Sequence, residues 1–125
     1  MNLGTELLYP ANNMIRLTVL YNLQPFVDED EFLEWRMGEH EESNNSRPGV
    51  MRTSFSIAKT GYALDSAPEY KFITTADWPD MATFTADFHD PEYQVKMDEW
   101  KKMLKDPLFI VSEIMLESEA LTEKQ

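Results

Sequence analysis

Apolar residues recur at every second position in the stretch MIRLTVLYNL (residues 14–23), with polar residues between them. An alternation with a period of two predicts a β-strand that has one face on a core. The apolar positions are Ile15, Leu17, Val19, Tyr21 and Leu23. We therefore expect the Tyr21 side chain to face the interior, near the end of this strand.

A helical pattern follows Pro25. Asp28 is placed to cap the N-terminus of this helix, and Glu31, three residues later, completes a capping-box pattern. The apolar stripe fails near Gly38, and NNSRPG (residues 44–49) has the composition of a loop. The helix is therefore expected to end between Gly38 and Asn45.

The second half of the chain contains two alternating stretches, then two helical ones, then a final strand. VMRTSFSIAKTG (50–61) and YKFITTA (70–76) predict a pair of antiparallel strands. Asp77 is expected to cap the next helix, and Asp90 followed by Pro91 to start another. The stretch PLFIVSEIML (107–116), rich in β-branched and aromatic residues, predicts the last strand.

The predicted order is β-α-β-β-α-β. This order is typical of a ferredoxin-like α+β fold, a four-stranded antiparallel sheet with two helices on one face. We place the domain at residues 14–117, preceded by an N-terminal extension (1–13) on the surface or on a partner subunit. Residues 118–125 are expected to form a C-terminal tail.

The sheet face away from the helices is predicted to be half apolar. Its expected residues are Arg16, Thr18, Leu20, Val50, Arg52, Leu108, Ile110, Ile114 and Leu116. An exposed patch of this kind marks an interface, and pairing two sheets face to face would cover it. We therefore expect a homodimer, a dimeric α+β barrel.

Composition narrows the possible partners. The formal net charge of −12 disfavours nucleic acid and anionic membranes, and no apolar run is long enough for a membrane span. The chain has no cysteine and two histidines, so a metal site is not expected. The start of the chain does not resemble a signal peptide, and a cytoplasmic location is the default.

Three stretches carry a resemblance to a known family. IRLTVLYNLQPFVDEDEFLEW, EYKFITTADWPDMATFTADFHDPEYQ and KDPLFIVSEIM resemble the REDY-like, HapK-type proteins. These belong to the dimeric α+β-barrel superfamily, with EthD-like proteins, antibiotic-biosynthesis monooxygenases and several isomerases and cyclases. The resemblance implies a link to secondary metabolism, since the namesake proteins lie in gene clusters for prodigiosin-type pigments. It brings no settled reaction, and EHEESNNSRPG after the first helix departs from the family pattern.

The resemblance also implies a cavity between the helices and the sheet, and many EthD-like proteins carry a histidine near the end of the first helix. His40 is therefore a catalytic candidate, and the neighbouring Glu39, Glu41 and Glu42 would raise its pKa and suit a general acid. The alternative is a histidine that only stabilises a helix end. Tyr21 is the second catalytic candidate, or else a core tyrosine.

Further candidates could bind a substrate. They are Trp35, Arg36, Arg52, Tyr70, Trp78, Phe88 and His89. Arg36 could hold a carboxylate or decorate the surface, and Arg52 needs a partner if buried, with Glu113 as the natural one. The aromatic residues could line a pocket for a flat ligand or fill the core, and His89 could face solvent or a pocket mouth.

The leading hypothesis is a protein that binds or processes an aromatic or polyketide-like small molecule without metal or organic cofactor. A non-catalytic carrier or chaperone of a reactive intermediate is the alternative, as is an EthD-like or monooxygenase-like enzyme. A dimer without a working pocket is the third possibility. Whether the protein is an enzyme is left open by the sequence.

Overall fold

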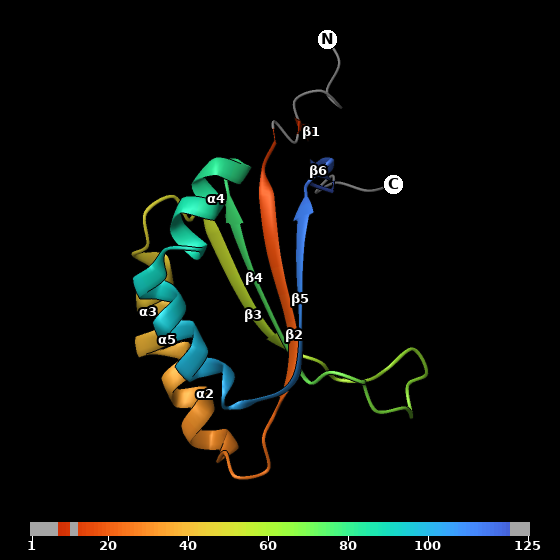
Figure 1. Cartoon of the computed structure of the whole chain (residues 1–125). Coiled ribbons are helices and arrows are strands. Elements are labelled where there is room, and N and C mark those ends of the chain that lie inside the picture. Colours follow the sequence, from red (N-terminus) through yellow and green to blue (C-terminus); the bar gives the residue numbers. More distant parts are fainter. Residues whose placement is uncertain (1–7, 11–12, 121–125) are drawn as a thin grey trace.

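In the computed structural model, which describes residues 8–10 and 13–120, all the helices of these residues cover one face of an antiparallel sheet (Figure 1). The sheet has four strands in the order β3-β4-β2-β5. Its strands are β2 (Ile15–Leu23), β3 (Arg52–Ile57), β4 (Phe72–Trp78) and β5 (Leu104–Glu113). The helices are α2 (Glu29–Met37), α3 (Glu39–Asn45), α4 (Met81–Phe88) and α5 (Pro91–Lys101). The predicted ferredoxin-like fold is confirmed.

The core lies between the sheet and the helices. The odd positions of β2 are buried, as their alternation predicts, and they meet aromatic residues from β4 and the helices. The buried cluster consists of Ile15, Leu17, Val19, Tyr21, Phe32, Phe72, Trp78, Phe84 and Phe88. Burying such large apolar side chains is the main force that holds helices on a sheet.

Two of the expected helix starts are confirmed. The Asp28 side chain accepts a hydrogen bond from the Glu31 backbone N–H at 2.9 Å. The Asp90 side chain accepts one from the Tyr93 N–H at 3.0 Å, with Pro91 in the first turn. Each cap satisfies a backbone donor that the helix itself leaves free.

The predicted cap Asp77 is wrong. Strand β4 continues through Trp78, and Asp80 caps α4 by accepting from the Thr83 N–H at 2.7 Å. Asp77 is instead a buried strand residue whose carboxylate binds Arg16 through two hydrogen bonds, of 2.8 and 2.9 Å. A bidentate pair of this kind satisfies the buried carboxylate, so Asp77 holds β4 to β2.

The first helical stretch is broken. Helix α2 ends at Met37, Gly38 has φ −105° and ψ −100°, and a second short helix, α3, begins at Glu39. His40 is therefore in the first turn of α3, where the expectation placed it near the end of one continuous helix. The break lets one side of α3 contact the sheet, where the Glu41 carboxylate accepts a hydrogen bond from Thr53 of β3.

The face of the sheet that the helices leave uncovered carries both charged and apolar side chains. Glu117 accepts from Arg16 and from Arg52, each at 3.2 Å, so the expected pairing of Arg52 with Glu113 is wrong. Leu108 and Ile110 are each 42% exposed on the same side as Thr18 and Leu20. Of the other residues expected there, Val50 packs against the core and Ile114 is buried.

A separate two-stranded ribbon joins the described ends of the chain. Strand β1 (Leu8–Pro10) pairs antiparallel with β6 (Leu116–Ser118). The described part of the predicted N-terminal extension thus pairs with the same chain, while residues 1–7, 11–12 and 121–125 lie outside the description. Among the described residues, no helix has the length and apolar character that crossing a membrane requires.

Candidate functional site

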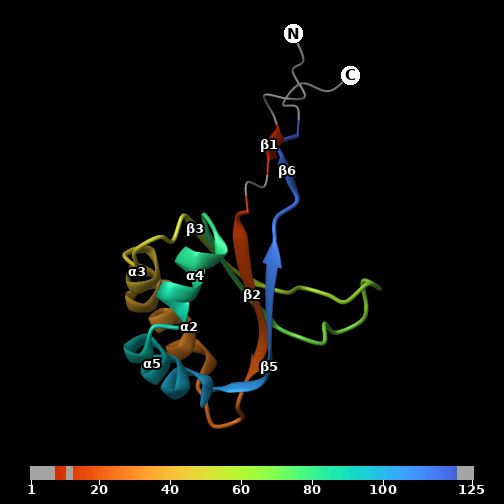
Figure 2. The same cartoon turned by 45° about the horizontal axis from the view of Figure 1, so that its top comes forward.

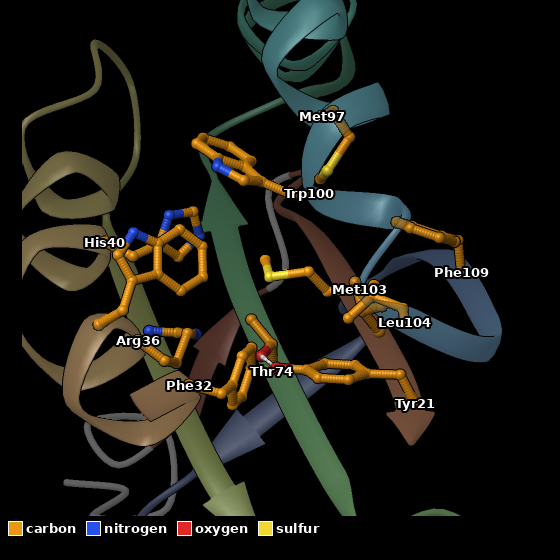
Figure 3. Close-up of a pocket in the computed structure, with 12 residues that line it drawn as sticks. Tyr21, Phe32, Arg36, His40, Thr74, Met97, Trp100, Met103, Leu104 and Phe109 are labelled. Atoms are coloured by element: carbon orange, nitrogen blue, oxygen red, sulfur yellow. Dashed lines mark hydrogen bonds between the residues drawn. The ribbon is translucent and has the colours of Figure 1, made fainter. Parts of the chain in front are cut away.

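An inner cavity of about 70 Å³ lies between the sheet and helices α2, α3 and α5 (Figure 3). Its wall is mainly aromatic and aliphatic, with a few polar side chains. The lining residues are Val19, Tyr21, Phe32, Trp35, Arg36, His40, Thr74, Met97, Trp100, Met103, Leu104 and Phe109. An apolar cavity with a few convergent polar groups is typical of a small-molecule site.

His40 is held between two tryptophans on the wall of this cavity. Its ring stacks on Trp35 with ring centres 4.3 Å apart and meets Trp100 edge-on at 4.4 Å. Its Nδ1 atom is buried and has no hydrogen-bond partner. A buried polar atom without a partner is costly, so this position is a place where a ligand atom would be stabilised.

The expected rise in the pKa of His40 is wrong. Burial lowers this pKa to about 4, and the charge of Arg36 lowers it further, while Glu41 acts in the opposite direction. The imidazole is therefore neutral at pH 7. A neutral ring can accept a proton but has no acidic proton to give, so His40 is available as a weak general base and not as the general acid expected from the sequence.

Arg36 is buried in the same wall, which excludes the surface role considered for it. Its Nη1 donates to the Glu41 carboxylate at 2.8 Å, and its guanidinium lies 4.6 Å from the centre of the Phe55 ring. Its Nη2 is buried without a partner. Arg36, which lines the cavity, therefore has a cationic donor atom without a hydrogen-bond partner.

Glu41 fixes this arrangement. Besides Arg36, its carboxylate accepts from the Thr53 hydroxyl at 2.6 Å and from the Asn45 amide at 3.1 Å. Although partial burial acts to raise the pKa of Glu41, the hydrogen bonds from Thr53 and Arg36 outweigh it and lower the pKa. The carboxylate is thus charged, and it ties α3 and α2 to strand β3.

Tyr21 adds a hydroxyl to the cavity wall. Its oxygen lies 3.1 Å from the Thr74 hydroxyl, and its ring stacks on Phe72 with centres 5.6 Å apart. Burial raises the pKa of Tyr21, and the Thr74 hydrogen bond and the nearby guanidinium of Arg36 act against the rise. The phenol is therefore protonated at neutral pH and is able to donate a hydrogen bond.

Two neighbouring spaces adjoin the inner cavity. A second cavity of about 60 Å³ shares Val19, His40, Thr74 and Met97 with it. An open groove of about 490 Å³ between α2 and α5 shares Phe32, Trp35, Trp100 and Met103. His40 thus borders both cavities, and the two tryptophans form part of the boundary between the inner cavity and the outside.

The second cavity has a polar cluster of its own. The Arg47 guanidinium lies 3.2 Å from the centre of the Tyr93 ring and forms an ion pair with Asp87 at 2.9 Å. The Trp78 indole N–H donates to the other oxygen of Asp87 at 2.9 Å. These contacts hold the loop after α3 against α4 and α5, and Arg47 adds positive charge near His40.

The structure gathers some of the predicted site residues and separates others. Tyr21, Trp35, Arg36 and His40 line the inner cavity, and Trp78 and Phe88 line the second. Three candidates line neither cavity. Arg52 is exposed on the opposite sheet face, Tyr70 lies in the β3–β4 connection, and His89 is exposed after α4, against Phe84 and Phe88.

Some lining residues were missed by the sequence interpretation. Thr74 lies in a stretch that was predicted only as a strand. Met103 was interpreted only as part of the buried stripe of the last helix, whereas Met97 and Trp100 on the same helix were considered either as core or as pocket lining. Arg47 lies in a segment that was assigned as a loop. For Thr74 the period-two alternation places it on the helix-facing side of β4, opposite Val19, which was a usable signal. No local signal marks Arg47.

The fold and cavity together define the class of protein, a ferredoxin-like α+β protein with an intra-subunit cavity. The family model for the REDY-like protein HapK matches residues 15–115. The chain therefore belongs to the REDY-like HapK family. A comparison with curated proteins gave no match.

Three solved structures show the same fold. An EthD-family protein from Bacillus halodurans is 17% identical, with 82% of this chain and 99% of that one covered and a TM-score of 0.63. A dimeric ferredoxin-like protein from Thermobifida fusca is 20% identical, with 85% and 95% covered and a TM-score of 0.63. A variant of SnoaB, a cofactor-independent oxygenase from Streptomyces nogalater, is 13% identical, with 89% and 99% covered and a TM-score of 0.60.

Proposed function

We propose that the protein binds a flat aromatic small molecule of secondary metabolism in the inner cavity and acts on it without metal or organic cofactor. Membership of the HapK family and the likeness of the fold to an oxygenase described as cofactor-independent support this class of function. The tryptophans beside His40 offer stacking surfaces for a planar ligand.

One observation carries the proposal. Arg36 Nη2 and His40 Nδ1 are both buried without a hydrogen-bond partner, and both residues line the same cavity. Leaving such an atom unpaired costs about 1–3 kcal/mol, more for a charged group. A ligand that supplies an anionic or hydrogen-bonding oxygen would recover this cost, so the pair selects an aromatic compound with an acidic or polar substituent.

In this proposal His40, Arg36 and Tyr21 each have a different role. The neutral His40 ring accepts a proton from an acidic O–H, N–H or C–H group of the ligand, whose electron pair stays on the ligand as an anion. The Arg36 guanidinium stabilises this anion, and the negative charge in turn raises the pKa of His40 as the proton arrives. Tyr21 supplies a neutral donor on the sheet side of the same cavity.

The inner cavity must widen to accept such a ligand. An engineered protein cavity of about 150 Å³ is known to bind benzene, whereas the inner and second cavities measure about 70 and 60 Å³. Trp100 and Met103 line both the inner cavity and the open groove between α2 and α5. Rotation of these side chains would connect the groove to Arg36 and His40.

A non-catalytic carrier is the second candidate. Trp35 and Trp100 separate the inner cavity from the open groove, and such a boundary would shield a bound compound from solvent. A carrier would use the same cavity and the same Arg36 donor without proton transfer. The two roles differ in their need for a base. His40→Gln keeps a hydrogen-bonding side chain but removes the base, so a carrier should retain most of its ligand binding while an enzyme should lose turnover of a candidate substrate.

We further propose that the working form is a homodimer. Leu108 and Ile110 are exposed on the sheet face that the helices leave uncovered, and the Thermobifida fusca relative is described as dimeric. Pairing two copies of this face would bury it. The cavity lies on the opposite side of the sheet, so each subunit carries its own site.

Isothermal titration calorimetry tests the binding site with indole-2-carboxylate as the planar anionic probe and indole as its uncharged counterpart. The wild-type chain should bind the carboxylate at least about tenfold more tightly than indole, and Arg36→Met should remove that preference. Arg52→Met is the matched control, because this arginine is exposed on the far side of the sheet. Equal effects of the two substitutions, or no binding of either probe, would contradict the proposal.

A further inference from the structure

The connection between β3 and β4, residues 58–71, forms an arm that leaves the body of the protein (Figures 1 and 2). In both views the arm extends away from the helix layer, on the side of the sheet that the helices leave uncovered. A connection this long within a compact domain usually carries a function of its own.

The base of the arm is clamped to the sheet. The Asn22 amide donates to the Glu69 carbonyl at 3.0 Å, and the Asn22 side-chain oxygen accepts from the Lys71 N–H at 2.9 Å. The Ala58 N–H donates to the Lys71 carbonyl at 2.8 Å, which joins the two sides of the arm. These bonds fix the direction in which the arm leaves the sheet.

The tip of the arm is also internally bonded. The Gly61 N–H donates to the Ser66 carbonyl, and the Ser66 N–H donates to the Ala63 carbonyl, each at 3.0 Å. The Ser66 hydroxyl donates to the same Ala63 carbonyl at 2.7 Å. The segment between Gly61 and Ser66 is therefore a closed turn with a defined shape.

This turn presents apolar side chains to the outside. Tyr62 is 106% exposed and Leu64 is 90% exposed, so neither packs on its own chain. A hydrogen-bonded turn that holds a tyrosine and a leucine in solvent is an arrangement expected of a contact surface, since both lose their exposed area only when a partner covers them.

We infer that the arm docks on a second copy of the chain, with Tyr62 and Leu64 as its contact residues. This inference rests on the homodimer proposed above, because the arm extends toward the side that the second copy would occupy. It adds a contact outside the paired sheets. Each subunit carries a formal net charge of −12, which opposes association of two copies. The dimer therefore needs apolar contacts to offset this repulsion, and the arm supplies one.

Photo-crosslinking tests this contact. The chain has no cysteine, so Tyr62→Cys creates a unique attachment point for a maleimide–diazirine label. Val95→Cys is the matched control, because Val95 is 66% exposed but lies on α5 in the helix layer. After irradiation, the label at position 62 should give a covalent dimer, and the label at position 95 should not.

Analytical ultracentrifugation separates failure of the arm from failure of the dimer. Tyr62→Ala with Leu64→Ala should raise the dissociation constant of the dimer at least about tenfold while circular dichroism stays unchanged. An unaltered dissociation constant, or equal crosslinking from positions 62 and 95, would overturn the arm contact and leave the dimer standing. A wild-type chain that is monomeric at about 100 μM would overturn both.

Discussion

His40→Gln should change the way in which stability depends on pH. In the wild-type protein, burial and the charge of Arg36 lower the pKa of His40 from 6.5 to about 4. Glutamine fills a similar volume and does not titrate. The pH-dependent part of the difference in unfolding free energy between the two proteins therefore reports the protonation of this one ring.

The sign and size of the effect follow from the shift. Because the folded-state pKa is below that of the unfolded chain, the unfolded state takes up the proton first as the pH falls below 6.5. The wild-type protein thus loses stability between pH 6.5 and pH 4 relative to the variant. At 1.36 kcal/mol per unit the full shift would amount to about 3 kcal/mol, and partial exposure of the ring reduces this to about 1–2 kcal/mol.

Urea unfolding followed by tryptophan fluorescence, at pH 7.5 and pH 4.5 and at one protein concentration, measures this difference. Wild type should lose about 1–2 kcal/mol more than His40→Gln on acidification. His89→Gln serves as the control, because His89 is exposed and outside the cavities. A wild-type protein that gains stability over His40→Gln at pH 4.5 would show a raised pKa and refute the assignment of His40 as a neutral base.

Three further substitutions test other parts of the structure by urea denaturation. Arg36→Met should change the free energy of unfolding by less than about 1 kcal/mol, because the loss of the hydrogen bond to Glu41 is offset by removal of the unpaired Nη2. A loss above about 3 kcal/mol would show that the two effects do not offset each other. Asp77→Asn should cost about 2–3 kcal/mol by breaking the pair with Arg16, which is partly exposed; a cost no larger than that of an exposed ion pair would count against its structural role. Gly49→Ala should cost about 1–3 kcal/mol, because Gly49 has φ +85° and a Cβ would overlap the Thr83 methyl group; adding Thr83→Ser should recover part of this cost, and no recovery would argue against the overlap.

Local patterns in the sequence predicted the order of the main strands and helices and two of the helix caps. The alternation from Ile15 to Tyr21 predicts which face of β2 is buried, because side chains along a strand point to opposite faces. The caps at Asp28 and Asp90 depend on contacts within a few residues. These features were predicted correctly because each is decided by neighbours along the chain.

Features decided by distant residues were predicted incorrectly or missed. Asp77 resembles a helix cap in its local context, but Arg16, 61 positions away in sequence, makes it a buried strand residue. The pKa of His40 was predicted from the adjacent glutamates. In the structure only Glu41 raises this pKa, and burial together with the charges of Arg36 and Arg47 lowers it by more. The tertiary structure decides both cases.

The sequence predicted some residues of the candidate site but not the burial of others, because that burial also depends on distant parts of the chain. Tyr21 and His40 were chosen by strand parity and family resemblance, and both line the inner cavity. Arg36 has a polar side chain on a helix with many acids, so its burial is not visible from composition. The break at Gly38 provides the ion-pair partner that a buried arginine needs, because α3 then brings the Glu41 carboxylate back to the Arg36 guanidinium.

The crystal structure of the protein with indole-2-carboxylate tests the central claim most directly, since the claim is that two unpaired buried atoms mark a ligand site. We predict the carboxylate about 3 Å from Arg36 Nη2 and the indole ring beside His40, with Trp100 and Met103 displaced toward the groove. A ligand that lies elsewhere while Arg36 Nη2 and His40 Nδ1 remain unpaired would contradict the account.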